Sequence, residues 1–150
     1  MALKEQIDND LKAALLGGNR LSSTVLRSLK AVILDEEVAK GKREEGLDDT
    51  SIEQIVAREI KKRNESAIIF ENACRPELAT DERAESEVLS AYLPAQATEA
   101  EIKAVIEKVK NELGANNPSM MGQVIGAVKA ELGNSADGGL IAKLVKESLI

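Results

Sequence analysis

Apolar residues recur every three or four positions through the first forty residues of the chain. The first stripe consists of Leu3, Ile7, Leu11 and Leu15. The second follows Asn19, a residue favoured as a helix N-cap, and consists of Leu21, Val25, Leu29, Val32 and Ile33. This spacing is typical of one face of an α-helix. The pattern predicts two amphipathic helices, separated at Gly17 and Gly18 and ending near Gly41, that pack against each other.

A mobile surface loop is expected at residues 41–49, where glycine and charge mix without a period. Thr50 and Glu53 then form a capping-box pattern and predict the start of a third helix. The residues expected on its inward face are Ile52, Val56, Ile60, Ala67, Phe70 and Cys74. Pro76 disfavours helical geometry at Arg75, so we expect a bend there and a fourth helix that ends near Tyr92.

The second half of the chain has the pattern of a small helical bundle. Pro94 interrupts the apolar pattern, and Thr98 with Glu101 forms a second capping box. Three short helices are expected after it, over residues 99–113, 118–132 and 137–149. No run alternates at period two, so the prediction is an all-α protein in two parts. The N-terminal helical hairpins span residues 1–93, the hinge residues 94–98, and the C-terminal three-helix bundle residues 99–150.

Composition narrows the chemistry that is open to this chain. Its 150 residues include no histidine, which excludes a histidine general base, and a single cysteine, which excludes an intrachain disulfide. No apolar run approaches the length of a membrane span or a signal peptide, so we predict a cytoplasmic protein without membrane association. The net charge of -6 argues against sequence-independent coating of nucleic acid but allows a local basic face.

Three segments of the sequence carry a resemblance to a known family. They are KKRNESAIIFENACRPELATDERAESEVLSAYLPAQ at residues 61–96, MGQVIGAV at 121–128 and ADG at 136–138. Their order and spacing resemble the GatB/YqeY family, and the chain looks like a stand-alone YqeY-like protein. The resemblance implies a fold like the C-terminal tail region of the tRNA-dependent amidotransferase B subunit. Many relatives have glycine and a basic residue where this chain has Asn134 and Ser135, which weakens any phosphate contact there.

The tail region of that subunit assists in holding tRNA, while the carboxylate is activated in a separate catalytic region that has no counterpart in this chain. The family label, carbon–nitrogen ligase with glutamine as amido-N-donor, is therefore taken to come from the larger subunit and not from an activity of this chain alone. The resemblance implies an accessory module that binds tRNA, an amidotransferase or an aminoacyl-tRNA synthetase. Two alternatives stay open: a protein–protein adaptor, and a ligase component that is active only in a complex.

Basic residues provide the candidate nucleic-acid contacts. Four of them, Arg58, Lys61, Lys62 and Arg63, fall within two turns of the third predicted helix and could bind phosphates. The alternative is an ordinary solvated face paired with Glu59 and Glu65. Further candidates are Arg75 at the bend, which could equally be structural like Arg27, and the C-terminal residues Lys129, Lys143 and Lys146.

Glycines mark a candidate partner groove in the C-terminal bundle. Gly122 and Gly126 lie four residues apart inside a predicted helix, where each costs roughly 1 kcal/mol relative to alanine. They either permit close helix packing or leave backbone open to a partner. Gly138 extends this groove, and the neighbouring Asp137 is expected to cap the last helix rather than to adjoin a phosphate.

No catalytic residue, cofactor or metal site is predicted. Ser22 and Ser23 with Lys30 superficially resemble amidase machinery but lack a positioned oxyanion site and a glycine-rich loop. The consecutive acids Asp35, Glu36 and Glu37 point in different directions on a helix and lack the spacing of a calcium loop. The sequence makes no prediction of oligomeric state.

Overall fold

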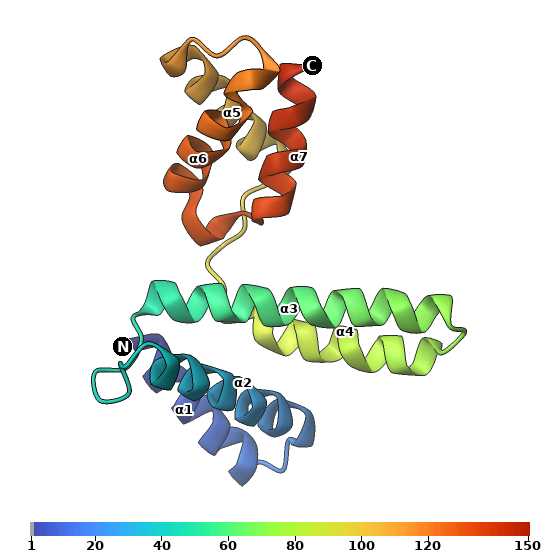
Figure 1. Ribbon diagram of the computed structural model, residues 1–150. Helices are drawn as coiled ribbons and strands as arrows, with labels where there is room; N and C mark the ends of the chain where they lie inside the picture. Colours follow the sequence, from blue (N-terminus) through green and yellow to red (C-terminus); the bar gives the residue numbers. More distant parts are fainter. Residues whose placement is uncertain (1) are drawn as a thin grey trace. The chain divides into compact units, whose positions relative to one another are not determined.

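The computed structural model describes residues 2–150, and every regular element in that range is helical (Figure 1). The α-helices are α1 (Ala2–Leu16), α2 (Arg20–Ala39), α3 (Asp49–Asn72), α4 (Pro76–Ser90), α5 (Glu99–Leu113), α6 (Met121–Leu132) and α7 (Gly138–Leu149). Two 3₁₀ turns, η1 (Pro118–Met120) and η2 (Gly133–Ser135), flank α6. The all-α prediction is confirmed. The chain divides into two compact units, Met1–Leu93 and Pro94–Ile150.

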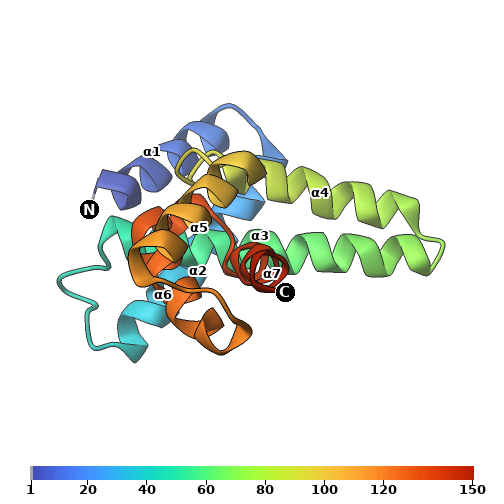
Figure 2. The ribbon, with the colours of Figure 1, turned by 90° about the horizontal axis from the view of Figure 1, so that it is seen from above.

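The first unit consists of two helical hairpins, α1–α2 and α3–α4. Helices α3 and α4 run side by side, and in both views the tip of their hairpin projects beyond α1 and α2 (Figures 1 and 2). One apolar core joins the hairpins, with Ile7, Leu26, Ile52, Leu89 and Tyr92 among its buried members. The core lies away from the projecting tip, so the tip presents side chains from both helices to solvent.

Several helix ends in the first unit match the sequence expectations, and one does not. The Asn19 side chain accepts a hydrogen bond from the Ser22 amide, as the N-cap prediction requires. Pro76 occupies the first turn of α4, as predicted. The capping box at Thr50 is wrong, because α3 begins at Asp49 and Asp48 is its N-cap, accepting from the Ser51 amide at 2.8 Å. Thr50 is already the second residue of the helix, so it does not occupy the N-cap position.

The inward position predicted for Cys74 is also wrong. Helix α3 ends at Asn72, and Cys74 is exposed in the turn before α4. Its φ of 61° lies in the left-handed region that few non-glycine residues adopt. Periodicity fails here because the chain has already left the helix when it reaches Cys74. Phe70, predicted on the same face, is half-buried.

The second unit is a bundle of α5, α6 and α7 around its own apolar core. Buried members of the core include Ile102, Ile106, Val124 and Ile141. Thr98 caps α5 by accepting from the Glu101 amide, and Asp137 caps α7 by accepting from the Leu140 amide, both as expected. The expected helix over 118–132 differs at its start, because residues 118–120 form the 3₁₀ turn η1.

Hydrogen bonds tie the start of the second unit to the turn between α6 and α7. The Ala97 amide donates to the Ser135 carbonyl at 2.7 Å. The Gln96 side-chain amide donates to the carbonyls of Pro94 at 2.9 Å and Asn134 at 3.1 Å. Most of the segment predicted as a hinge therefore has a structural role inside the second unit.

Candidate nucleic-acid interface

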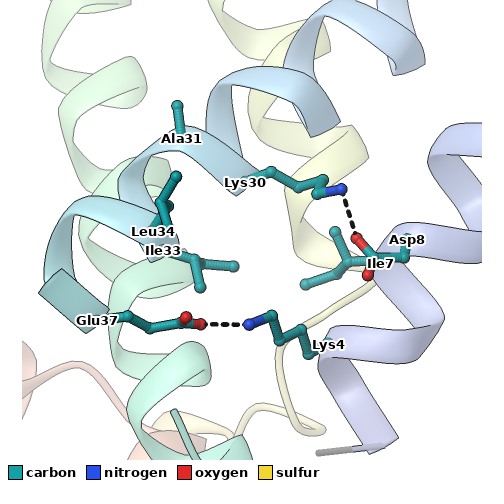
Figure 3. Close-up of a pocket in the computed structure, with 8 residues that line it drawn as sticks. All are labelled: Lys4, Ile7, Asp8, Lys30, Ala31, Ile33, Leu34 and Glu37. Atoms are coloured by element: carbon teal, nitrogen blue, oxygen red, sulfur yellow. Dashed lines mark hydrogen bonds and ion pairs between the residues drawn. The ribbon is translucent and has the colours of Figure 1, made fainter. Parts of the chain in front are cut away.

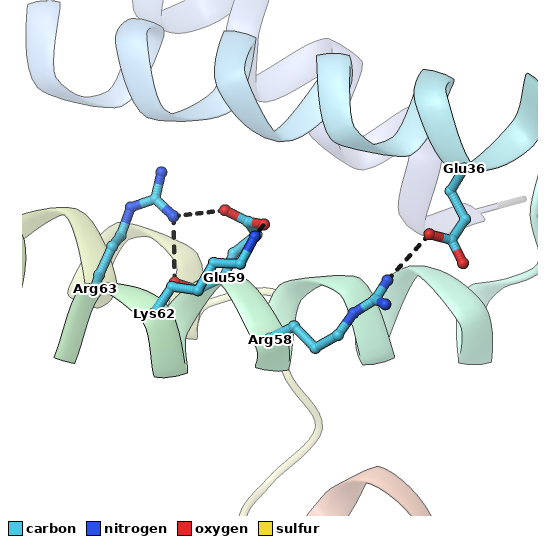
Figure 4. Close-up of polar contacts among 5 residues, drawn as sticks. All are labelled: Glu36, Arg58, Glu59, Lys62 and Arg63. Atoms are coloured by element: carbon cyan, nitrogen blue, oxygen red, sulfur yellow. Dashed lines mark hydrogen bonds and ion pairs between the residues drawn. The ribbon is translucent and has the colours of Figure 1, made fainter. Parts of the chain in front are cut away.

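Most of the basic residues predicted as phosphate contacts on α3 form ion pairs with carboxylates of the same unit (Figure 4). Arg58 lies 3.2 Å from Glu36 of α2. Lys62 lies 3.3 Å from Glu59, and Arg63 lies 2.9 Å from the other oxygen of the same carboxylate. The alternative of an internally paired face, raised from the sequence, thus describes three of the four side chains, although their partners include Glu36 rather than Glu65.

Arg63 is built into the packing of α3 against α4. Its side chain is 13% exposed, compared with 72% for Lys62. It donates to the Glu59 carbonyl at 3.2 Å and lies 3.5 Å from Glu85 of α4. Burial alone would raise the pKa of Glu59, but the hydrogen bonds from Arg63 and Lys62 outweigh burial and lower that pKa. Arg63 therefore stabilises the hairpin and is poorly placed to reach a phosphate.

Two of the predicted cations in the first unit are open to solvent. Within residues 2–150, neither Lys61 nor Arg75 has an ion-pair partner, and both are exposed. Arg75 stands at the N-cap position of α4, without a side-chain capping bond, at the tip of the hairpin. Lys61 lies more than two turns before that tip on α3. The structure does not gather these residues into one free basic surface.

The lysines predicted in the second unit are all exposed. Lys129 lies in the last turn of α6, and Lys143 and Lys146 lie one turn apart on α7. No carboxylate in the described part of the chain forms an ion pair with any of them. Lys103 of α5, which the sequence analysis did not select, is exposed and unpaired in the same way. Paired lysines in this unit are Lys108, with Glu131 at 2.9 Å, and Lys110, with Glu107 at 3.3 Å.

The glycines of the predicted partner groove have two different roles. A Cβ atom on Gly122 or Gly126 would meet no atom within 4 Å, so neither residue is required for helix packing. A Cβ on Gly138 would lie 3.2 Å from both Cε and Nζ of Lys129. The packing interpretation is thus wrong for Gly122 and Gly126. Gly138 makes room for Lys129, whose side chain crosses to the first turn of α7.

Spacing along α6 connects the open glycines with a lysine. Gly122, Gly126 and Lys129 lie at positions i, i+4 and i+7, which share one face of a helix. All three are exposed. We call this the glycine–lysine face. It combines accessible backbone with an ammonium group that reaches the start of α7, where Lys143 and Lys146 follow along the helix.

One polar contact of the first unit has no counterpart in the sequence expectations. The Tyr92 hydroxyl donates to the Asp10 carboxylate at 2.6 Å. Burial, together with this hydrogen bond and the charge of Asp10, raises the pKa of the phenol above its usual range. The signal available in the sequence was that Tyr92 is one of two aromatic residues in the chain. The bond joins α1 to the residues after α4 and is structural.

Among the residues that the structure describes, no group of three histidine, cysteine, aspartate or glutamate side chains is arranged to hold a metal ion. Over the same residues, none of the helices is both long enough and apolar enough to cross a membrane. The exposed lysines and backbone of the second unit remain the arrangement best suited to a polyanion.

The chain is similar to a known protein family and to curated proteins of two yeasts. The family model described as "Yqey-like protein" matches residues 4–149. A curated protein of Clavispora lusitaniae, named "Altered inheritance of mitochondria protein 41, mitochondrial", is 28% identical over 89% of this chain and 78% of its own length. A protein of the same name from Lachancea thermotolerans is 32% identical over 76% of this chain and 61% of its own length.

Proposed function

This chain belongs to the YqeY-like protein family, and we propose that it is a non-catalytic accessory module that binds tRNA through its second unit. The resemblance to the tail region of the amidotransferase B subunit implies a similar fold, and the proposal is that the ligand is similar too. An enzyme that acts on tRNA, such as an amidotransferase or an aminoacyl-tRNA synthetase, is the expected associate. Catalysis is left to that associate.

The observation that carries the proposal is the set of unpaired lysines Lys129, Lys143 and Lys146. Phosphate binding requires ammonium groups that are not already neutralised by protein carboxylates. The second unit has six lysines and seven acidic residues, for a net charge of -1, whereas the first unit has a net charge of -5. A nearly neutral unit with several free lysines repels a polyanion less than the acidic first unit does.

The glycine–lysine face supports the same proposal. At Gly122 and Gly126 no side chain separates the α6 backbone from a ligand, so a ribose–phosphate chain can approach closely. Lys129 completes this face and provides a charge for the approaching phosphate. The Asp137 carboxylate is held by the Leu140 amide as the cap of α7, which keeps a phosphate away from that helix terminus itself.

The second candidate function is a protein–protein adaptor. The open backbone at Gly122 and Gly126 favours it, because a partner helix could pack closely there. A role as a ligase component would need a catalytic partner and would be tested by glutamine-dependent turnover in that complex. The relatives are named as mitochondrial proteins, so the cytoplasmic location predicted from the sequence stays a prediction.

The proposal is tested by equilibrium binding of total tRNA to the full chain across a salt series. If three lysines contact phosphates, changing Lys129, Lys143 and Lys146 to glutamine should flatten the slope of log K against log salt by about 2 to 3. Absence of binding at low salt would contradict the proposal. Tight binding with the same salt slope in the wild type and the triple variant would also contradict it. A partner that binds the glycine–lysine face without RNA would favour the adaptor.

A further inference from the structure

An open pocket lies in the first unit where α1, the first turns of α2 and the end of α4 meet. Its volume is about 460 Å³. Ala14, Leu26 and Tyr92 line it and are buried, which gives it a mainly apolar inner wall. Asp10 lines it from α1 and Glu87 from α4. We call this the Asp10 pocket, and it shares no residue with the proposed RNA contact.

The Asp10 pocket offers a ligand charge of one sign. Asp10 and Glu87 are the only charged residues among the described residues that line it. Neither carboxylate forms an ion pair anywhere in residues 2–150. The first unit around them has a net charge of -5. Uncompensated carboxylates in an acidic unit attract a cation and repel a polyanion such as RNA.

A second hollow of the first unit, between α1 and α2, shows the contrast (Figure 3). The charges that line it are paired across the two helices, with Lys4 2.6 Å from Glu37 and Lys30 2.8 Å from Asp8. Because each of these charges already has a partner, that hollow does not distinguish ligands by their charge. The unpaired carboxylates of the Asp10 pocket favour a positive ligand.

Tyr92 holds the Asp10 carboxylate in place at the pocket. Its hydroxyl donates to one carboxylate oxygen at 2.6 Å, and the tyrosine is only 6% exposed. Within the described part of the chain, no hydrogen bond or ion pair engages the other oxygen. A carboxylate has lone pairs for several donors, so that oxygen can accept from a ligand without breaking the bond to Tyr92.

We propose that the Asp10 pocket binds an arginine side chain of a partner protein, with the aliphatic stem against Leu26 and the guanidinium group toward Asp10 and Glu87. Long basic side chains combine an apolar stem with a charged head, which matches an apolar wall beside two carboxylates. A guanidinium group is more weakly hydrated than an ammonium group, so it loses less hydration free energy in a partly buried site.

The exposed rim of the pocket favours a protein as the source of this side chain. The residues that line the pocket and are themselves exposed are Ala13, Asn19, Glu87 and Ala91. Small-molecule sites usually enclose most of the ligand surface, whereas this rim would leave a free ligand in contact with water. An arginine presented by a protein is covered from the outside by the partner's own surface.

The test is an NMR titration of the isotope-labelled full chain with capped pentapeptides. The first peptide has a central arginine flanked by alanines. The second has citrulline instead, which keeps the shape of arginine but has no charge, and the third has glutamate. Propylguanidinium serves as a free organic cation. We expect the arginine peptide to shift the amide signals of Asp10 and Glu87 at millimolar concentration, and the other two peptides to bind at least tenfold more weakly.

Variants of the two carboxylates locate the binding site. Asp10→Asn should weaken the arginine peptide about tenfold, since it removes a partly buried charge but keeps an acceptor for the Tyr92 hydroxyl. Glu87→Gln removes an exposed charge and should weaken the peptide about two- to fivefold. Glu77→Gln is the matched control, because Glu77 is also an exposed acid of α4 but lies outside the pocket. Circular dichroism of each variant checks that the helices are retained.

Four results would overturn the proposal. They are no shift of the pocket signals by the arginine peptide, equal binding of the citrulline peptide, equal losses in Glu87→Gln and Glu77→Gln, and propylguanidinium binding as tightly as the peptide. The last result would assign the pocket to a free organic cation. None of these results bears on tRNA binding, because the residues concerned belong to the first unit alone.

Discussion

Each unit has its own apolar core, but the first unit also buries two carboxylates, Glu37 and Glu59, whereas in the second unit most lysines face solvent. The buried polar residues in the described chain are Ser23, Glu37, Glu59 and Ser86, all of the first unit. The buried residues of the second unit are apolar in the same range. The first unit has more basic residues, but ion pairs with its own carboxylates occupy many of them.

Basic residues can be assigned as candidate phosphate ligands only when their local partners are known. Residues 61–63 form the densest basic run in the chain, yet Arg63 is mostly buried and Lys62 contacts Glu59. Lys143 and Lys146 are less conspicuous in the sequence, but α7 holds a single acidic residue, Glu147, and neither lysine is paired. Freedom from ion pairs with protein carboxylates is therefore a better guide to phosphate contacts than the density of basic residues in the sequence.

The largest expected effect comes from breaking either core. Ile106→Ala should destabilise the second unit by about 2–5 kcal/mol, because it removes a buried side chain and leaves a cavity. The core around Ile106 contains no residue of Met1–Leu93. Hydrogen exchange followed by mass spectrometry should show loss of protection in residues 94–150, and Ile52→Ala should show the converse. Equal loss in both units would contradict their independence.

A smaller effect is expected from the buried charge network of the first unit. Glu59→Gln should cost about 1–2 kcal/mol at neutral pH, because Arg63 loses its closest carboxylate in a mostly buried position. Glu65→Gln on the same helix is the control, since Glu65 is exposed. Urea denaturation of both variants measures the difference. A cost no larger than that of the control would show that the network does not stabilise the hairpin.

The pH dependence of that difference follows from the direction of the pKa shift. The folded-state pKa of Glu59 lies below its ordinary value of 4.5. Its stabilising contribution is then complete above that value and is lost as the pH falls through the folded-state pKa. The free energies of unfolding of wild type and Glu59→Gln should converge in acid. A difference that stays constant from neutral pH to pH values well below 4.5 would contradict the assignment.

The smallest expected effect tests whether Gly126, on the glycine–lysine face, is open or packed against another helix. Gly126→Ala should stabilise the second unit by about 0.5–1 kcal/mol, because alanine is the better helix former and its Cβ meets open space. Gly133→Ala is the contrasting variant, since its φ of 54° is strained for alanine, and it should destabilise. Thermal unfolding of both variants decides the matter. Destabilisation by Gly126→Ala would restore the close-packing interpretation.

Local signals in the sequence predicted much of the fold. Asn19, Thr98 and Asp137 were identified as caps because a cap depends on an amide only three residues away. Thr50 failed because two successive acids precede it and Asp48 provides the cap first. Cys74 failed because helical periodicity was extended beyond the end of α3 at Asn72.

The candidate site was harder to predict because it depends on partners that are distant in the sequence. Arg58 pairs with a glutamate 22 residues away, and the Arg63–Glu85 pair joins neighbouring helices. The open surroundings of Gly126 depend on how α5 and α7 pack around α6, which spacing within one helix does not reveal. The lysines of the second unit were found as candidates, but their freedom from carboxylates required the structure.

The most direct test of the account compares two charge-matched triple variants in one titration with total tRNA at about 100 mM salt, where phosphate contacts still dominate affinity. One variant changes Lys129, Lys143 and Lys146 to glutamine, and the other changes Lys61, Lys62 and Arg75. Both remove three positive charges. We expect the first variant to lose most of the affinity and the second to retain it within about threefold. The reverse order, or equal losses, would contradict the claim that the second unit provides the RNA contacts.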